Sequence, residues 1–198
     1  MQQGHIDFPL TSEGEENALL LGDLLKQHKW SRVYSSDLGR ALRTTEILLS
    51  RSQVSPPEPN PTHLIREVSY GFLEALPIHC SFDEAREHRA KERGVPVEQI
   101  EDDRESLESV LDRQNRFLSQ LLEELEASIE HQNPQVLCVT HGGFIKRFLR
   151  NHCRLHLEEK IENCSVSLVR VRRGQDGQID CVASKDEINL LNDSTVIP

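Results

Sequence analysis

Val136-Leu137-Cys138-Val139-Thr140-His141-Gly142-Gly143-Phe144 is the stretch that decides the fold. A short apolar run ends in a histidine, two glycines follow, and residues 145–150 predict a helix. The order predicts a strand that delivers His141 to one edge of a sheet, where a helix begins. Glycines let the backbone approach a ligand, and the free N–H groups of a helix start favour an anion. The stretch indicates either a phosphate or carboxylate site that contains His141, or a tight turn in which the histidine is incidental.

Length and composition favour one globular domain over residues 1–198, because 198 residues with 36% hydrophobic content can bury a core. No run is apolar enough to span a membrane, and no secretory signal begins the chain, so we expect a cytoplasmic protein. Its five cysteines are expected to be reduced, with Cys138 a buried thiol inside its strand. The net charge of −10 argues against nucleic-acid binding. Neither the cysteines nor the histidines have ligand spacing, so we predict no metal and no cofactor.

A second strand-to-helix unit lies nearer the N-terminus. Residues 12–28 predict an amphipathic helix that Ser12 caps, and residues 32–34 predict a short strand. Ser35, Ser36 or Asp37 then caps another helix. The buried face of that helix carries Leu38, Ala41, Thr45 and Leu48. Two such units predict an α/β sheet that binds ligands at the carboxyl ends of its strands.

The remaining segments predict further elements around this sheet. Residues 52–61 are rich in proline and predict a loop, and Leu64-Ile65 predicts an apolar strand. Residues 81–105 predict a charged helical excursion that breaks at Gly94. A long helix follows, and residues 166–171 and 179–184 predict strands, the latter in a hairpin. The apolar stripe of the long helix carries Leu107, Val110, Leu111, Leu118, Leu121, Leu122, Leu125 and Ile129.

Two charged residues stand where they could take part in chemistry with His141. Arg40 lies in the first turn of the second helix and could hold a phosphate with two hydrogen bonds. It could equally be an exposed arginine paired with Asp37, and Arg43 is a rival candidate. Glu67 follows the expected strand at residues 64–65 and could donate a proton. It could equally be a surface glutamate paired with Arg66.

Several segments together resemble one protein family. Gln3-Gly4-His5-Ile6-Asp7-Phe8-Pro9-Leu10-Thr11 is similar to the segment that follows the active-site loop of the histidine phosphatase (phosphoglycerate mutase-like) superfamily. Tyr34-Ser35-Ser36-Asp37-Leu38-Gly39-Arg40-Ala41 resembles its second signature, and Leu64-Ile65-Arg66-Glu67 the segment of its proton donor. Glu105-Ser106 with Arg113 resembles the start of its penultimate long helix, and Val139-Thr140-His141-Gly142-Gly143 its second histidine signature. The matches follow the family order, and the TIGAR-type fructose-2,6-bisphosphatase branch is the most similar.

The resemblance implies a fold, a reaction and a set of site residues. The fold is a three-layer α/β sandwich with a mostly parallel sheet and helices on both faces. A histidine on the first strand attacks the phosphoryl group of a small phosphorylated metabolite, such as a sugar bisphosphate, and becomes phosphohistidine. Arg40 and His141 hold the phosphoryl oxygens, with His141 cationic or donating, and Glu67 protonates the leaving oxygen. Gln3, Gly4, His5 and Gly142 are the expected substrate-binding residues.

The family's Arg-His-Gly triplet, which carries the nucleophile, does not occur in this sequence. We therefore expect the chain to be N-terminally truncated, with the first strand of the sheet missing and its neighbours facing each other across a gap. Without the nucleophile the covalent route is closed. Two functions remain: a phosphatase whose first strand lies upstream, and a non-catalytic or regulatory protein that binds a phosphate ligand.

Overall fold

A parallel sheet of three strands lies at the centre of the computed structural model, which describes residues 3–77, 79–128, 133–174, 176–188 and 190. Strand β1 (Arg32–Ser36) is in the middle, between β2 (Pro59–Thr62) and β3 (Val136–Val139). Strands β4 (Arg170–Arg173) and β5 (Ile179–Val182) form a separate antiparallel hairpin. The hairpin confirms the expected pairing of residues 179–184 with the strand before them.

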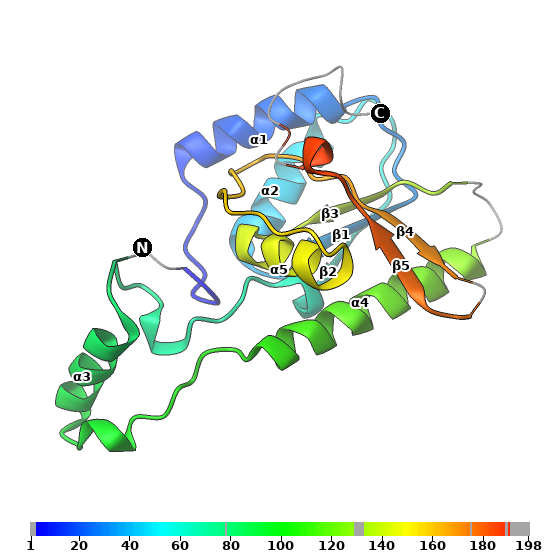
Figure 1. Ribbon diagram of the computed structural model, residues 1–198. Helices are drawn as coiled ribbons and strands as arrows, with labels where there is room; N and C mark the ends of the chain where they lie inside the picture. Colours follow the sequence, from blue (N-terminus) through cyan, green and yellow to red (C-terminus); the bar gives the residue numbers. More distant parts are fainter. Residues whose placement is uncertain (1–2, 78, 129–132, 175, 189, 191–198) are drawn as a thin grey trace.

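Helices cover both faces of the parallel sheet (Figure 1). On one face, Leu21 of α1 (Ser12–Leu25) and Leu48 of α2 (Gly39–Ser50) pack near Val139. On the other face lie α4 (Leu107–Ala127) and α5 (Gly142–His152). This arrangement confirms the expected three-layer α/β fold with a parallel sheet.

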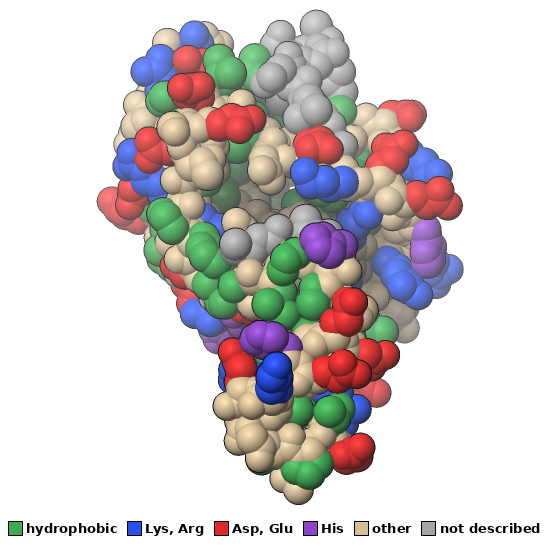
Figure 2. All heavy atoms as spheres, turned by 90° about the vertical axis from the view of Figure 1, so that its left-hand side faces the viewer, with side chains coloured by type: hydrophobic (Ala, Val, Ile, Leu, Met, Phe, Trp, Pro, Cys, Tyr) green, Lys and Arg blue, Asp and Glu red, His purple; other side chains and the backbone are tan. Residues whose placement is uncertain are grey.

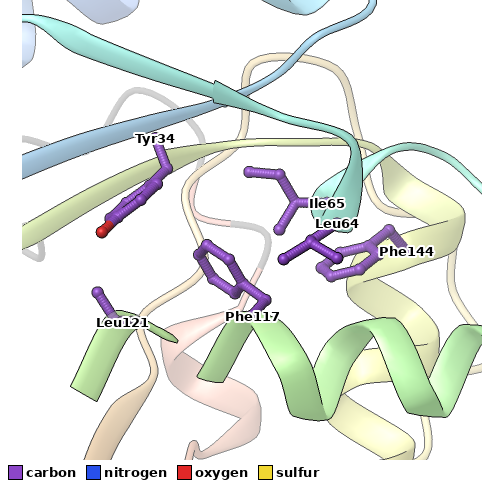
Figure 3. Packing of buried hydrophobic residues seen from close by; sticks show 6 residues of the cluster. All are labelled: Tyr34, Leu64, Ile65, Phe117, Leu121 and Phe144. Carbon is purple, nitrogen blue, oxygen red and sulfur yellow. The ribbon is translucent and has the colours of Figure 1, made fainter. Parts of the chain in front are cut away.

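The core between β1 and α4 is built around aromatic rings (Figure 3). Tyr34 points from β1 toward Phe117 of α4, and the two rings meet edge to face at 5.3 Å between centroids. Ile65 is fully buried beside them, and Phe144 closes the cluster from α5. This core fixes residues 63–67 and the start of α5 on the same side of the sheet.

The predicted helices form, but their caps differ from the sequence prediction. Thr11, and not Ser12, caps α1, because the Thr11 Oγ1 accepts a hydrogen bond from the Gly14 amide at 3.1 Å. At α2 no adjacent side chain is the cap. The Asp7 carboxylate accepts instead from the Gly39 amide at 2.6 Å, so the cap comes from 32 residues upstream.

The charged excursion forms as predicted, with α3 (Phe82–Arg93) projecting away from the sheet (Figure 1). Gly94 ends it in the left-handed conformation at φ +65°. The apolar stripe of α4 is only partly as predicted. Leu107 is 65% exposed and Leu111 39%, although Val110 and Gln114 in the same turns of α4 are buried, so the buried face there excludes the two leucines. Ile129 lies outside the described residues.

Three strand predictions need correction. The proline-rich loop contains β2, which pairs with β1 through residues 59–62. Proline is tolerated there because β2 is an edge strand. Leu64 and Ile65 form a short 3-10 helix, His63–Ile65, and not a strand. Residues 166–171 contribute one isolated bridge at Val166 and the start of β4.

Strand β3 has an open edge. It pairs with β1 on one side, and within the described part of the chain no strand pairs with its other side. Cys138, in the middle of β3, is exposed, which contradicts the expectation of a buried thiol. Leu137 and Val139 are only partly buried although both are apolar. An apolar strand with an open edge and partly exposed side chains borders a cavity, which forms part of the site described next.

Candidate active site

His141 stands at the end of β3 and is the N-cap residue of α5. Its Nε2 lies 2.8 Å from the Oγ of Ser36, the buried last residue of β1. Burial, together with the positive charges of Arg40 and Arg113, lowers the pKa of His141 to about 3. The imidazole is therefore neutral at pH 7. The expected cationic form is therefore not the one present, and the neutral ring still has one N–H that can donate a hydrogen bond.

Arg40 is buried in the first turn of α2, so the alternative of an exposed arginine is wrong. Its guanidinium donates to the carbonyl oxygens of Gly4 at 2.7 Å and Ile6 at 3.0 Å. Burial lowers the pKa of Arg40, while the charges of Glu67 and Asp7 oppose the shift. Asp37, the partner that the sequence offered for Arg40, pairs with Arg66 instead. These contacts tie residues 4–6 to the start of α2.

The rival pairings proposed from the sequence are also settled. Asp37 accepts two hydrogen bonds from Arg66, at 2.6 and 2.7 Å, which lower the pKa of Asp37. Arg66 is therefore occupied, so the prediction of a surface Arg66–Glu67 pair is wrong. Arg43 is exposed and pairs with Glu15 at 2.8 Å. Of the two arginines on α2, only Arg40 lies in the interior.

Glu67 points its carboxylate at the N-terminus of α5. One oxygen accepts from the Gly143 amide at 3.0 Å and the other from the Val68 amide at 2.8 Å. A Cβ added to Gly143 would lie 2.5 Å from Glu67 Oε1, so only glycine admits this approach. Since Gly143 follows His141 by two residues, the helix start brings Glu67 and His141 together.

These side chains surround one end of a cavity of about 870 Å³. Its polar end is lined by Gln3, Gly4, Arg40, Glu67, Tyr70, His141 and Gly142. The cavity continues along the open edge of β3, where Leu137, Cys138 and Val139 line it together with apolar residues of α1 and α2. Figure 2 shows the face of the molecule that is hollowed above the α3 projection. An arginine and a neutral histidine at the start of a helix are groups that together bind a phosphate.

The expected substrate-binding residues divide into two groups. Gln3, Gly4 and Gly142 line the cavity, as Arg40, Glu67 and His141 do. His5 is not among the residues that line it. Its Nε2 lies 2.8 Å from the carbonyl oxygen of Glu67, so the ring is turned to the backbone of the acid.

Sequence reasoning missed Ser36 and Tyr70 as site residues. Ser36 was considered only as a helix cap, but its hydroxyl contacts His141. Tyr70 lines the cavity, and burial raises its pKa with a contribution from the nearby Glu67 charge. Ser36 reaches the site through a contact 105 residues away in the chain, which no local pattern marks, whereas Tyr70 lies three residues after Glu67.

Among the residues that the structure describes, His141 is the only histidine that lines the cavity. No three described His, Cys, Asp or Glu side chains gather as the ligands of a metal ion would. No described helix is long and apolar enough to cross a membrane. The polar end of the cavity therefore presents anion-binding groups and the Glu67 carboxylate, and Glu13 and Glu162 also line the cavity.

Comparison with known proteins places this geometry in a family. The chain matches the histidine phosphatase superfamily (branch 1) over residues 1–183. It is 29% identical over 171 residues to the probable phosphoglycerate mutase GpmB of Citrobacter koseri, covering 84% of this chain and 75% of that protein. It is also 29% identical over 175 residues to phosphoglycerate mutase-like protein 4 of Arabidopsis thaliana, covering 87% of this chain and 73% of that protein.

Solved structures share the fold. A phosphoglycerate mutase from Bacillus anthracis superposes with a TM-score of 0.71 at 24% identity, covering 98% of this chain and 86% of that one. A mycobacterial glucosyl-3-phosphoglycerate phosphatase superposes with a TM-score of 0.72 at 18% identity, covering 96% of this chain and 92% of that one. Together with the match over residues 1–183, the fold and the site lead to one assignment: the chain belongs to the histidine phosphatase superfamily, branch 1.

Proposed function

We propose that this chain forms most of a phosphatase that hydrolyses a small phosphorylated metabolite through a phosphohistidine. The observation that carries the proposal is the convergence of Arg40, Glu67 and His141, from three distant segments, on the polar end of one cavity. Phosphoryl transfer depends mainly on positioning and on electrostatic stabilisation of the transferred group. A cation, a neutral hydrogen-bonding imidazole and an acid supply these two requirements.

Each residue has a role in the proposed reaction. A histidine nitrogen attacks phosphorus, the N–P bond forms, and the bond to the leaving oxygen breaks as Glu67 gives that oxygen a proton. Arg40 and His141 hold the remaining oxygens as negative charge moves onto them. Water then attacks phosphorus and returns its proton to Glu67, and the N–P bond breaks to release phosphate. The histidine and the acid are thereby regenerated.

We propose that the attacking histidine is carried by a strand that pairs with the open edge of β3. The cavity runs along that edge, from Leu137 to the polar end at His141. A strand added there would be parallel to β1 and β3 and would end beside Arg40. Its inward side chains would cover Val139 and the α1 and α2 leucines that now line the cavity.

The substrate that we propose is a sugar bisphosphate such as fructose-2,6-bisphosphate, as in the TIGAR-type branch. Phe82 of the α3 excursion packs against Phe72, two residues after Tyr70 of the site, and we propose that this segment bounds the part of the substrate beyond the reacting phosphate. We place the reaction in the cytoplasm, which agrees with the free state of all five cysteines.

The test compares the 198-residue chain with the same chain preceded by a strand that ends in Arg-His-Gly. We expect phosphate release only from the extended protein, with a loss of at least about 100-fold in Glu67→Gln and His141→Ala. Arg40→Ala is a further variant that tests the site, and Arg43→Ala is its matched control, because Arg43 is exposed on the same helix. An extended, folded protein that is inert toward sugar phosphates and phosphorylated acids would contradict the proposal.

The second candidate function is binding of a phosphate ligand without catalysis. It is favoured by the absence of a second histidine among the described residues that line the cavity. Calorimetry of the 198-residue chain with inorganic phosphate and with fructose-2,6-bisphosphate tests it. Binding that Arg40→Ala abolishes, together with an inert extended protein, would favour this function over the phosphatase.

A further inference from the structure

We propose that Arg113 is a positioning residue that holds the backbone of Glu67 so that its carboxylate meets the start of α5. The inference rests on the proposed role of Glu67 as the acid. Arg113 lies on α4 and is 7% exposed. It does not line the cavity, so it acts through Glu67 and not on substrate.

All five N–H donors of the Arg113 guanidinium are used. Nη1 donates to the carbonyl oxygens of Leu64 at 3.0 Å and Arg66 at 2.8 Å. Nη2 donates to the carbonyl oxygen of Glu67 at 3.2 Å and to Glu105 at 3.0 Å. Nε donates to Glu105 at 2.7 Å. Three carbonyl groups, of Leu64, Arg66 and the acid Glu67 itself, therefore accept from one planar cation.

Glu105 holds the guanidinium in this orientation. Its carboxylate forms the two-point pair with Arg113, and it also accepts from the Ser69 amide at 3.3 Å. Burial alone would raise the pKa of Glu105, but the hydrogen bonds and charge of Arg113 outweigh burial and lower it. The guanidinium also lies over the Phe144 ring, at 5.1 Å from its centroid. The Arg113 guanidinium is thus held by the Glu105 carboxylate and by the face of the Phe144 ring.

The consequence is a fixed direction for the Glu67 side chain. Leu64 and Ile65 belong to the 3-10 helix His63–Ile65, and residues 66 and 67 follow it. None of the four pairs as a strand, so no sheet ladder holds their carbonyl groups. Arg113 and His5 both contact the Glu67 carbonyl oxygen, while Gly143 and Val68 contact the carboxylate. The contacts to the Glu67 carbonyl oxygen fix the backbone from which the side chain starts, and the Gly143 and Val68 amides hydrogen-bond the carboxylate at its other end. A lysine at position 113 has one ammonium and cannot span three carbonyls and a carboxylate.

The first experiment uses NMR to measure the change in the Gly143 amide proton shift that Glu67→Gln produces in the 198-residue chain. In the otherwise unsubstituted protein this change, the Gly143 response, should be large because the Glu67 carboxylate accepts from the Gly143 amide, and the Arg113 Nε–H should be protected from exchange. In Arg113→Lys the change should fall to less than half, whereas Arg116→Lys, at an exposed site on the same helix, should behave like the unsubstituted protein. An Arg113 Nε–H that exchanges freely, or a Gly143 response unchanged in folded Arg113→Lys, would overturn the inference.

Glu105→Asp is the second variant, in case Arg113→Lys does not fold. It keeps the charge pair but withdraws the carboxylate by one methylene, so the same loss of the Gly143 response is expected. A folded Glu105→Asp protein with the full response would also overturn the inference.

The second experiment uses the extended protein and varies the leaving group. A misplaced acid should lower kcat by about 100-fold for a sugar phosphate, with KM nearly unchanged. The loss in kcat/KM, which reports the step that forms the phosphohistidine, should be less than threefold for p-nitrophenyl phosphate, whose leaving group needs no proton. Equal losses for both substrates would show a general structural role and overturn the inference. An inert extended protein with an Arg113-dependent Gly143 response would contradict the proposed function alone.

Discussion

Replacing His141 by glutamine should make the folded protein less sensitive to acid. Glutamine places an amide nitrogen near the position of the imidazole Nε2, so a hydrogen bond to Ser36 can persist without a titrating group. In the native protein the pKa of His141 is lowered to about 3 from an ordinary value of 6.5. Between these two values the unfolded chain binds a proton that the folded chain does not.

The sign and size of the effect follow from that difference in proton binding. Stability is fully present above the unfolded pKa and falls as pH drops through 6.5 toward about 3. Lowering the pH from 8 to 5 should cost about 2 kcal/mol through His141, since RT ln(1 + 10^1.5) is about 2 kcal/mol. Other groups titrate in the same range, including His152, whose pKa burial lowers. They contribute equally to both proteins.

The assay is urea unfolding of both proteins at several values between pH 5 and pH 8. The difference in unfolding free energy between native protein and His141→Gln should shift by about 2 kcal/mol in favour of the variant at the acid end. Any change in unfolding free energy that His141→Gln causes equally at every pH cancels when the differences at pH 5 and pH 8 are compared. A difference independent of pH would refute the conclusion that His141 is neutral in the folded protein.

Three further outcomes are expected. Gly143→Ala should change the free energy of unfolding by less than about 1 kcal/mol, because the end of the Glu67 side chain can move away from the added methyl group, yet it should lower kcat of the extended protein. A Cβ added to Gly142 has its nearest contact at 3.5 Å, so Gly142→Ala should leave the contact between Glu67 and Gly143 intact. Equal activities of the two glycine variants would contradict this. Ser36→Ala should cost about 1–2 kcal/mol in urea unfolding, because it removes a buried partner of His141; no loss would mean that the contact adds nothing. Inorganic phosphate at ten times its Kd should stabilise the chain by about 1.4 kcal/mol in thermal melts, and His141→Gln should reduce this gain; an unchanged melting temperature would argue against the anion site.

Local patterns were sufficient for the helices and for most strands. The periodicity of α1, the buried face of α2 and the Gly94 break after α3 are properties of neighbouring residues, and the structure has them as predicted. Periodicity failed at Leu107 and Leu111, which continue the α4 stripe but lie where no other element covers them. It also failed at β2, since the pairing with β1 that makes residues 59–62 a strand is not written in their own residue types.

The site depended on contacts between residues far apart in sequence. The sequence left two alternatives for each charged residue: a phosphate or Asp37 for Arg40, and a role as proton donor or a surface pair with Arg66 for Glu67. Asp37 instead pairs with Arg66, which leaves Arg40 in the interior and Glu67 facing α5. His5 was expected at the substrate and lies against the Glu67 carbonyl oxygen. Which of these side chains pair depends on how the tertiary fold places segments that are far apart in sequence.

The sequence by itself determined the family, the order of the elements and the types of residue that a phosphate site needs, because motifs and periodicity are local. Only the tertiary structure decided how those residues are held. The Gly143 amide and the Glu67 carboxylate are 76 residues apart in the chain, and Arg113 reaches the Glu67 carbonyl from 46 residues away. Such contacts form because β3 and α4 are fixed by a shared core. The direction of the acid is therefore a property of the packed fold and not of any one segment.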